Sequence, residues 1–145
     1  MKHQEIAVKL DLLREYLRDL KPYVYLDTET ILSNKEKVLS VERLFQLVVD
    51  EAADINSYMA YQILDKVPES YQSSFHILVE GKIFDSTFID AISESARIRN
   101  QIVHDYEKLQ KKDGVEAIKK FFPLYEKYLD VLVKKFKSDI LSISK

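Results

Sequence analysis

Residues 97–106, RIRNQIVHDY, include three side chains of the kinds that act on phosphate esters: Arg99, His104 and Tyr106. They lie in a stretch whose apolar spacing predicts a largely buried helix. A guanidinium stays charged in proteins and offers a planar fork to phosphate oxygens, whereas an imidazole gains and loses a proton near neutral pH. Because a charge without acceptors is costly to bury, Arg99 predicts a cleft or an interface here rather than dry core.

Helix geometry places Arg99 and Tyr106 on one side of the predicted helix and His104 on another. Arg99 and Tyr106 are seven residues apart and share nearly one side of a helix that turns about 100° per residue. His104 follows Arg99 by five residues, which places it roughly 140° around the same helix. Either the helix ends or distorts here, or a second copy of the chain completes the site. We favour the second, since a two-fold dimer sets identical patches opposite each other.

Each of these residues also has a plain structural interpretation, which is the stronger one when each is taken singly. An arginine at such a position often reaches solvent or pairs with a carboxylate. The candidate partners are Glu51, Asp54 and Glu94. His104 would then be a hydrogen-bonded structural residue, and Tyr106 a packing residue near a helix end. Only the combination and its spacing favour a functional site.

Composition predicts a single all-α domain over residues 1–145. The chain is 46% hydrophobic, which is enough for a core, and its 2 glycines and 3 prolines leave little material for hairpins. It has no cysteine, and its histidines, His3, His76 and His104, show no metal-ligand spacing. We therefore expect no metal site and no cofactor. The N-terminus lacks the apolar run of a signal peptide and nothing approaches membrane-spanning length, so we expect a cytoplasmic protein without membrane contact.

The small net charge of -2 hides an asymmetry along the chain. Residues 1–95 hold 10 basic against 17 acidic side chains, a charge of -7, and residues 96–145 hold 12 against 7, a charge of +5. This division fits an anionic ligand at the C-terminal part, or an acidic surface meeting a basic one in an oligomer. Two solvated faces of a bundle explain the charge equally well.

The N-terminal half predicts two long helices and a short turn. The first helix follows from leucines and Ile6 at alternating three- and four-residue steps, and Pro22 is expected to stop it. One helical turn capped by Asp27 or Thr28 follows. A long helix is then expected around residues 40–65, capped by Ser40.

The C-terminal half predicts three further helices. A short one in residues 69–80 is closed by Gly81, and the next is capped by Asp85 or Ser86 and runs to about Tyr106. Gly114 marks the next break, and the last helix carries Ile118 to Phe136 with a kink or restart at Pro123. Roughly five helices with short loops make an antiparallel bundle.

The string RNQIVHDY, which is Arg, four residues, His, one residue, Tyr, resembles the signature of HEPN (higher eukaryote and prokaryote nucleotide-binding) domains, specifically of the HepT-like toxins. QLVVDEAADINSYM is similar to the acidic stretch of that family's second long helix, with Glu51 and Asp54 in the corresponding places. SYQSSFHILVEGKIF resembles the family's short third helix and the loop after it. The resemblance spans nearly the whole chain.

The resemblance implies a two-fold homodimer of HEPN bundles that acts as the toxin of a type VII-like toxin–antitoxin pair. The toxin would be a metal-independent endoribonuclease with RNA as substrate. Its partner would be a minimal nucleotidyltransferase antitoxin, which could form a higher complex with it and silence it by transferring AMP to Tyr106. That AMP would place an anionic phosphate beside Arg99, where it would compete with RNA.

The residues fit this implied chemistry. Metal-free RNA cleavage needs a base for the 2′-hydroxyl, an acid for the leaving 5′-oxygen and positive charge on the phosphorane. His104, doubled across a dimer, would supply the acid and the base, and Arg99 the charge, with a 2′,3′-cyclic phosphate as product. Asn100 could donate to phosphate, and Asp54 could orient Arg99 or a histidine.

Two other functions remain open on the sequence. The chain could be a non-catalytic helical subunit that binds a nucleotidyltransferase, in which case His104 does no acid–base work. It could also bind a nucleotide directly without cutting RNA.

Overall fold

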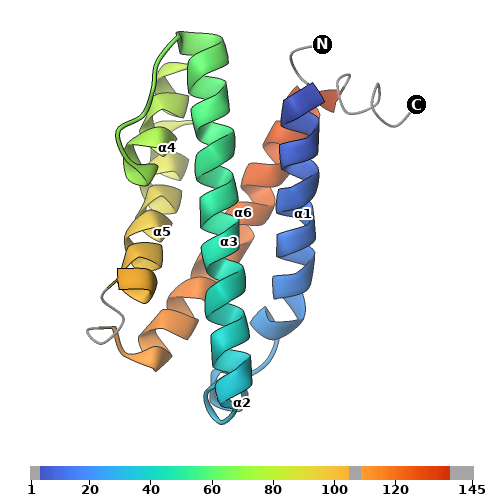
Figure 1. Ribbon diagram of the computed structural model, residues 1–145, viewed down its shortest axis with the longest axis vertical. Helices are drawn as coiled ribbons and strands as arrows, with labels where there is room; N and C mark the ends of the chain where they lie inside the picture. The colour runs from blue at the N-terminus through green and yellow to red at the C-terminus, as the bar shows by residue number, and fades with distance from the viewer. Residues whose placement is uncertain (1–3, 105–108, 138–145) are drawn as a thin grey trace.

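A computed structural model describes residues 4–104 and 109–137, and the regular elements within them are all helical (Figure 1). The six α-helices and one π-helix run in the order α1 Gln4–Val24, α2 Thr28–Leu32, α3 Lys35–Met59, η1 Ala60–Leu64, α4 Tyr71–Glu80, α5 Ser86–His104 and α6 Lys111–Lys135. The prediction of an all-α bundle is confirmed. The extra helix in the count is α2, the single turn expected near Asp27.

Helix α1 buries the stripe that its spacing predicts, from Ile6 to Leu20, against α3 and α6. It does not stop at Pro22 but continues to Val24. A proline lacks the N–H that would bond the carbonyl four residues earlier, so Pro22 costs one helix hydrogen bond, and only two helical residues follow it. The helix therefore absorbs Pro22 and ends two residues later.

Helix α3 begins earlier than the sequence pattern indicates. Its cap is Asn34, whose Oδ1 accepts a hydrogen bond from the backbone N–H of Lys37 at 3.1 Å. Ser40 lies inside the helix, so its predicted capping role is wrong. Beyond Met59 the chain passes into the π-helix η1. This helix ends at its C-cap residue Asp65, whose φ of 54° lies in the left-handed region.

Helix α5, which carries Arg99 and His104, and the preceding helix α4 both begin at well-formed caps. Ser70 and Ser73 make reciprocal side-chain to backbone bonds of 3.0 Å at the start of α4. Gly81 ends α4 as predicted, although Lys82, with a φ of 60°, is the residue in the left-handed region. Asp85 accepts a 2.8 Å bond from the N–H of Phe88 and so caps α5, also as predicted.

The break expected at Gly114 is absent, because α6 begins at Lys111 and contains both Gly114 and Pro123. Gly114 is buried, and a Cβ atom there would lie 3.3 Å from Cδ2 of Leu109. This glycine lies within the helix, next to Leu109, rather than ending the helix.

In Figure 1, α4 and α5 lie side by side on one edge of the bundle and α1 on the other.

A chain of buried polar groups crosses the core and reaches the start of α4. The Tyr128 hydroxyl donates to Asn56 Oδ1 at 2.5 Å, and Asn56 Nδ2 donates to Ser74 Oγ at 3.1 Å. Ser74 Oγ in turn donates to the carbonyl of Tyr71 at 2.6 Å. Because unpaired polar groups are costly to bury, this chain fixes the position of α4 relative to α3 and α6.

Candidate functional site

Arg99 of α5 is held by three residues from two other helices and its own. Its Nε donates to Asp50 Oδ1 of α3 at 2.9 Å, and one Nη donates to Oδ1 of the adjacent Asn100 at 3.1 Å. The guanidinium carbon lies 5.1 Å from the centre of the Tyr71 ring of α4. The side chain is 14% exposed. Arg99 therefore sits in neither dry core nor bulk solvent, and a small part of its side chain is exposed.

The partners of Arg99 explain why a permanent charge is tolerated here. Asp50 supplies the opposite charge together with a hydrogen bond, and the Tyr71 ring covers one face of the cation. Burial raises the pKa of the Tyr71 hydroxyl, and the neighbouring Asp50 carboxylate raises it further against the lowering effect of Arg99. Tyr71 therefore keeps its proton at neutral pH and remains a hydrogen-bond donor.

His104 is exposed at the end of α5, away from the covered position of Arg99. The helix is regular between the two residues, so their side chains diverge by the roughly 140° that ideal geometry requires. A single protomer thus holds an anchored cation on one side of α5 and an open imidazole on another. Tyr106 lies outside the described residues.

The carboxylate that orients Arg99 is Asp50 and not Asp54. Asp54 lies one turn further along α3 and forms an ion pair with Lys9 of α1. Between them, Glu51 has a buried Oε2 with no hydrogen-bond partner among residues 4–104 and 109–137. Burial, with the charge of Asp54 as a smaller cause, raises the pKa of Glu51 to about 7.

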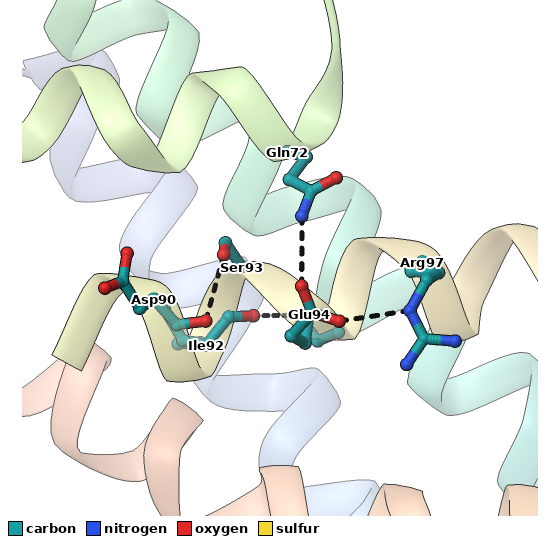
Figure 2. Close-up of polar contacts among 7 residues, drawn as sticks. Gln72, Asp90, Ile92, Ser93, Glu94 and Arg97 are labelled. Carbon is teal, nitrogen blue, oxygen red and sulfur yellow. Dashed lines mark hydrogen bonds and ion pairs between the residues drawn. The ribbon is translucent and has the colours of Figure 1, made fainter. Parts of the chain in front are cut away.

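Glu94, another candidate partner of Arg99, instead joins a surface chain between α4 and α5 (Figure 2). Its Oε2 accepts from Gln72 Nε2 at 3.1 Å and its Oε1 accepts from Arg97 Nε at 3.0 Å. Asn100 uses its carbonyl oxygen on Arg99, which leaves its Nδ2 group as a donor.

Asp50 and Tyr71 are the two site residues that sequence reasoning missed. Asp50 belongs to the acidic stretch VVDEAAD, so the sequence signalled the right turn of the helix but not the right residue. No pattern connects Tyr71 with Arg99, since the two are 28 positions apart and meet only through the packing of α4 on α5.

The described residues contain no candidate site for a metal ion. No group of three or more His, Asp or Glu side chains in them is arranged to hold a metal ion. His76, on α4, has Nδ1 3.9 Å from Asp90 of α5 and is exposed. Within the same ranges, no helix has the length and apolar character needed to cross a membrane.

These features define an all-helical bundle with an arginine–histidine motif at the end of its fifth α-helix. The chain matches the ribonuclease HepT-like family over residues 13–132 and belongs to that family. It is 30% identical over 131 residues to the tRNA nuclease HepT of Aphanizomenon flos-aquae, covering 86% of this chain and 87% of the relative. It is 25% identical over 95 residues to the mRNA nuclease HepT of Shewanella oneidensis, covering 66% and 68%.

Solved structures share the fold at lower identity. The tri-AMPylated HEPN toxin of Shewanella oneidensis, in complex with the MNT antitoxin, superposes with a TM-score of 0.76 at 22% identity, covering 86% of this chain and 92% of that one. A toxin–antitoxin structure with AMP-PNP gives 0.77 at 21%, covering 88% and 97%. YutE of Bacillus subtilis, a cytosolic protein of unknown function, gives 0.69 at 15%, covering 88% and 90%.

Proposed function

We propose that this chain is the endoribonuclease toxin of a toxin–antitoxin pair and that it cuts RNA without a metal. The observation that carries the proposal is the geometry of α5, in which Arg99 is anchored by Asp50 and Tyr71 while His104 stands exposed. Membership of the ribonuclease HepT-like family, and the nuclease names of its relatives, support the same function.

The reaction is an internal transesterification of the RNA backbone. A histidine takes the proton of the 2′-hydroxyl, the 2′-oxygen bonds to phosphorus, and the bond to the 5′-oxygen breaks. A second histidine, protonated, gives its proton to that leaving oxygen, so the products are a 2′,3′-cyclic phosphate and a 5′-hydroxyl. Arg99 stabilises the negative charge on the phosphorane through the Nη hydrogens that Asn100 does not accept, since Asp50 accepts from Nε.

A homodimer supplies the two histidines. In one protomer His104 points away from Arg99, so a lone chain offers one imidazole and a cation on a different side of α5. A two-fold axis beside the end of α5 would place a second His104 and a second Arg99 across one furrow. The acid and base roles are then divided between two copies of the same residue.

The antitoxin is a minimal nucleotidyltransferase that transfers AMP to the Tyr106 hydroxyl. A HEPN neighbour of the same fold is tri-AMPylated and bound to its MNT antitoxin, which supports this mode of control. The adenylate phosphate would meet the same cations as the RNA and block the furrow. Mass spectrometry after co-expression with the neighbouring nucleotidyltransferase should show added AMP that is lost from Tyr106 in Tyr106→Phe.

The central test combines growth and cleavage. We expect the wild type to arrest growth in a bacterial host and to cut RNA in the presence of EDTA, leaving 2′,3′-cyclic phosphate ends. Arg99→Ala and His104→Ala should each lose both effects, by about 100-fold or more in rate. Arg18→Ala, an exposed arginine of α1 paired with Glu15, is the matched control and should behave as wild type. Cleavage that EDTA abolishes would contradict the mechanism.

One observation favours a second, non-catalytic function. The charge of Arg99 is already met by Asp50, as in a purely structural pair. In that case the chain would serve as a binding subunit for the nucleotidyltransferase. Equal growth effects of wild type, Arg99→Ala and His104→Ala, together with intact binding of the nucleotidyltransferase, would establish it.

A further inference from the structure

Arg97 shares a face of α5 with His104, whereas Arg99 does not. Seven residues separate Arg97 from His104, which leaves them about 20° apart around the helix and about 10 Å apart along its axis. Arg99, two residues on from Arg97, points to nearly the opposite side, toward Asp50 and Tyr71. The exposed side of α5 that ends in His104 therefore carries its own arginine.

A polar chain fixes the orientation of Arg97. Gln72 of α4 donates to one oxygen of Glu94 at 3.1 Å, and the other oxygen of Glu94 accepts from Arg97 Nε at 3.0 Å. Figure 2 shows the Nε edge of the guanidinium turned to Glu94 and the two Nη groups on its far side. Among the described residues those Nη groups have no partner, and the side chain is 56% exposed.

The charge of the side chains along α5 changes from negative to positive at Arg97. Asp90 and Glu94 precede it, and from Ser95 to His104 the helix has no acidic side chain. Glu94 is paired with Arg97 itself, and Asp90 lies 3.9 Å from His76. Between Glu94 and His104, the exposed side of α5 therefore carries the positive charge of Arg97, and the carboxylate of Glu94 that precedes it is already engaged.

We propose that Arg97 is a second phosphate-binding residue, which holds the RNA backbone on the His104 side of α5 at a phosphate away from the one that reacts. This inference rests on the proposed function and extends it. The distance of about 10 Å to His104 corresponds to roughly three stacked nucleotides, fewer in an extended strand. A guanidinium anchored at Nε presents its Nη groups as donors to one phosphate. Arg97 positions the substrate and leaves the chemistry to His104 and Arg99.

The test measures binding separately from cleavage. A fluorescent single-stranded RNA with 2′-O-methyl groups cannot be cut, and its anisotropy with EDTA present reports affinity over a series of salt concentrations. We expect Arg97→Gln to bind about tenfold more weakly. The slope of log affinity against log salt should fall by about 0.7, as for one lost phosphate contact on a single strand. Arg97→Lys should keep the wild-type slope, and Arg18→Gln, the matched control, should change neither quantity.

Cleavage of unmodified RNA distinguishes this inference from the function on which it rests. If the inference holds, Arg97→Gln raises KM about tenfold and leaves kcat within about twofold. If the wild type cuts RNA and Arg97→Gln matches it in KM and salt slope, only the role of Arg97 is overturned. A wild type that neither binds nor cuts RNA overturns both. If Arg97→Gln instead weakens self-association in analytical ultracentrifugation and leaves RNA affinity unchanged, Arg97 faces a second copy of the chain and the proposal is wrong.

Discussion

At the scale of single residues, helix α3 places three carboxylates of one acidic stretch in three different environments. Asp50 pairs with Arg99 of α5, Asp54 pairs with Lys9 of α1, and Glu51 has a buried oxygen without a partner in the described chain. The sequence could show that this stretch faces the motif helix. It could not show which carboxylate meets Arg99, because Asp50 and Asp54 lie one turn apart on nearly the same side of the helix.

Glu51 should make the protein less stable as the pH rises. Its pKa is about 7 in the folded protein against 4.5 ordinarily, so the folded state holds more protons between these values. Stability from this group is therefore full below about pH 4.5 and falls as the pH rises to about 7. We expect Glu51→Gln to raise the free energy of unfolding at pH 8 by about 1 kcal/mol, since the partial exposure of the side chain reduces the full effect. At pH 4.5 the substitution should give no such stabilisation.

Urea unfolding of wild type and variant at both pH values measures this difference. Glu116→Gln, at an exposed position on α6, is the matched control and should give equal stability to wild type at both. A Glu51→Gln variant that is less stable than wild type at pH 8 would show that the ionised carboxylate is stabilised in the fold.

At the scale of helices, apolar spacing predicted the elements well and their ends less well. The predictions of the buried apolar face of α1 and of the helix ends at Asp85 and Gly81 are confirmed, because each depends on residues close in sequence. The start of α3 was placed six residues late, at Ser40 instead of Asn34. Both residue types can cap a helix, and apolar spacing does not distinguish between them. In the structure the side chain of Asn34 makes the capping hydrogen bond.

Gly114 is a second case in which the sequence did not predict where a helix ends, and it leads to a testable prediction. A glycine between helical segments usually ends one, yet here it lies inside α6 with helical neighbours on both sides. Replacement by alanine should stabilise the protein by about 0.5 kcal/mol, because alanine favours the helix and loses less entropy on folding. The new methyl would meet Cδ2 of Leu109 at 3.3 Å, and that flexible, partly exposed side chain can move by a few tenths of an ångström.

Thermal unfolding of Gly114→Ala tests this expectation. Gly81→Ala is the comparison, since Gly81 lies at a helix end where an added Cβ would have only ordinary contacts of 3.7 Å or more. It should change stability by less than Gly114→Ala does. A loss of stability in Gly114→Ala would mean that Leu109 is held too firmly to move, and that α6 needs glycine for this close approach.

At the scale of the whole molecule, the direction of the two motif side chains is the feature that calls for a second protomer. The sequence predicted their divergence, because it follows from five residues on any regular helix. It could not predict that Arg99 would be anchored through α3 and α4, which leaves for a ligand the Nη hydrogens that Asn100 does not accept. The active unit we propose is thus a dimer whose furrow contains two arginines and two histidines.

Mixed dimers test this proposal directly. In a dimer of one wild-type chain with one His104→Ala chain, a shared furrow keeps both arginines but only one histidine, so it lacks either the acid or the base. We expect such mixed dimers, co-expressed with two different affinity tags and purified through both, to cut RNA about 100-fold more slowly than the wild type. If each protomer contained a separate and complete site, the wild-type chain would still work, and the mixed dimers would keep about half of the wild-type rate.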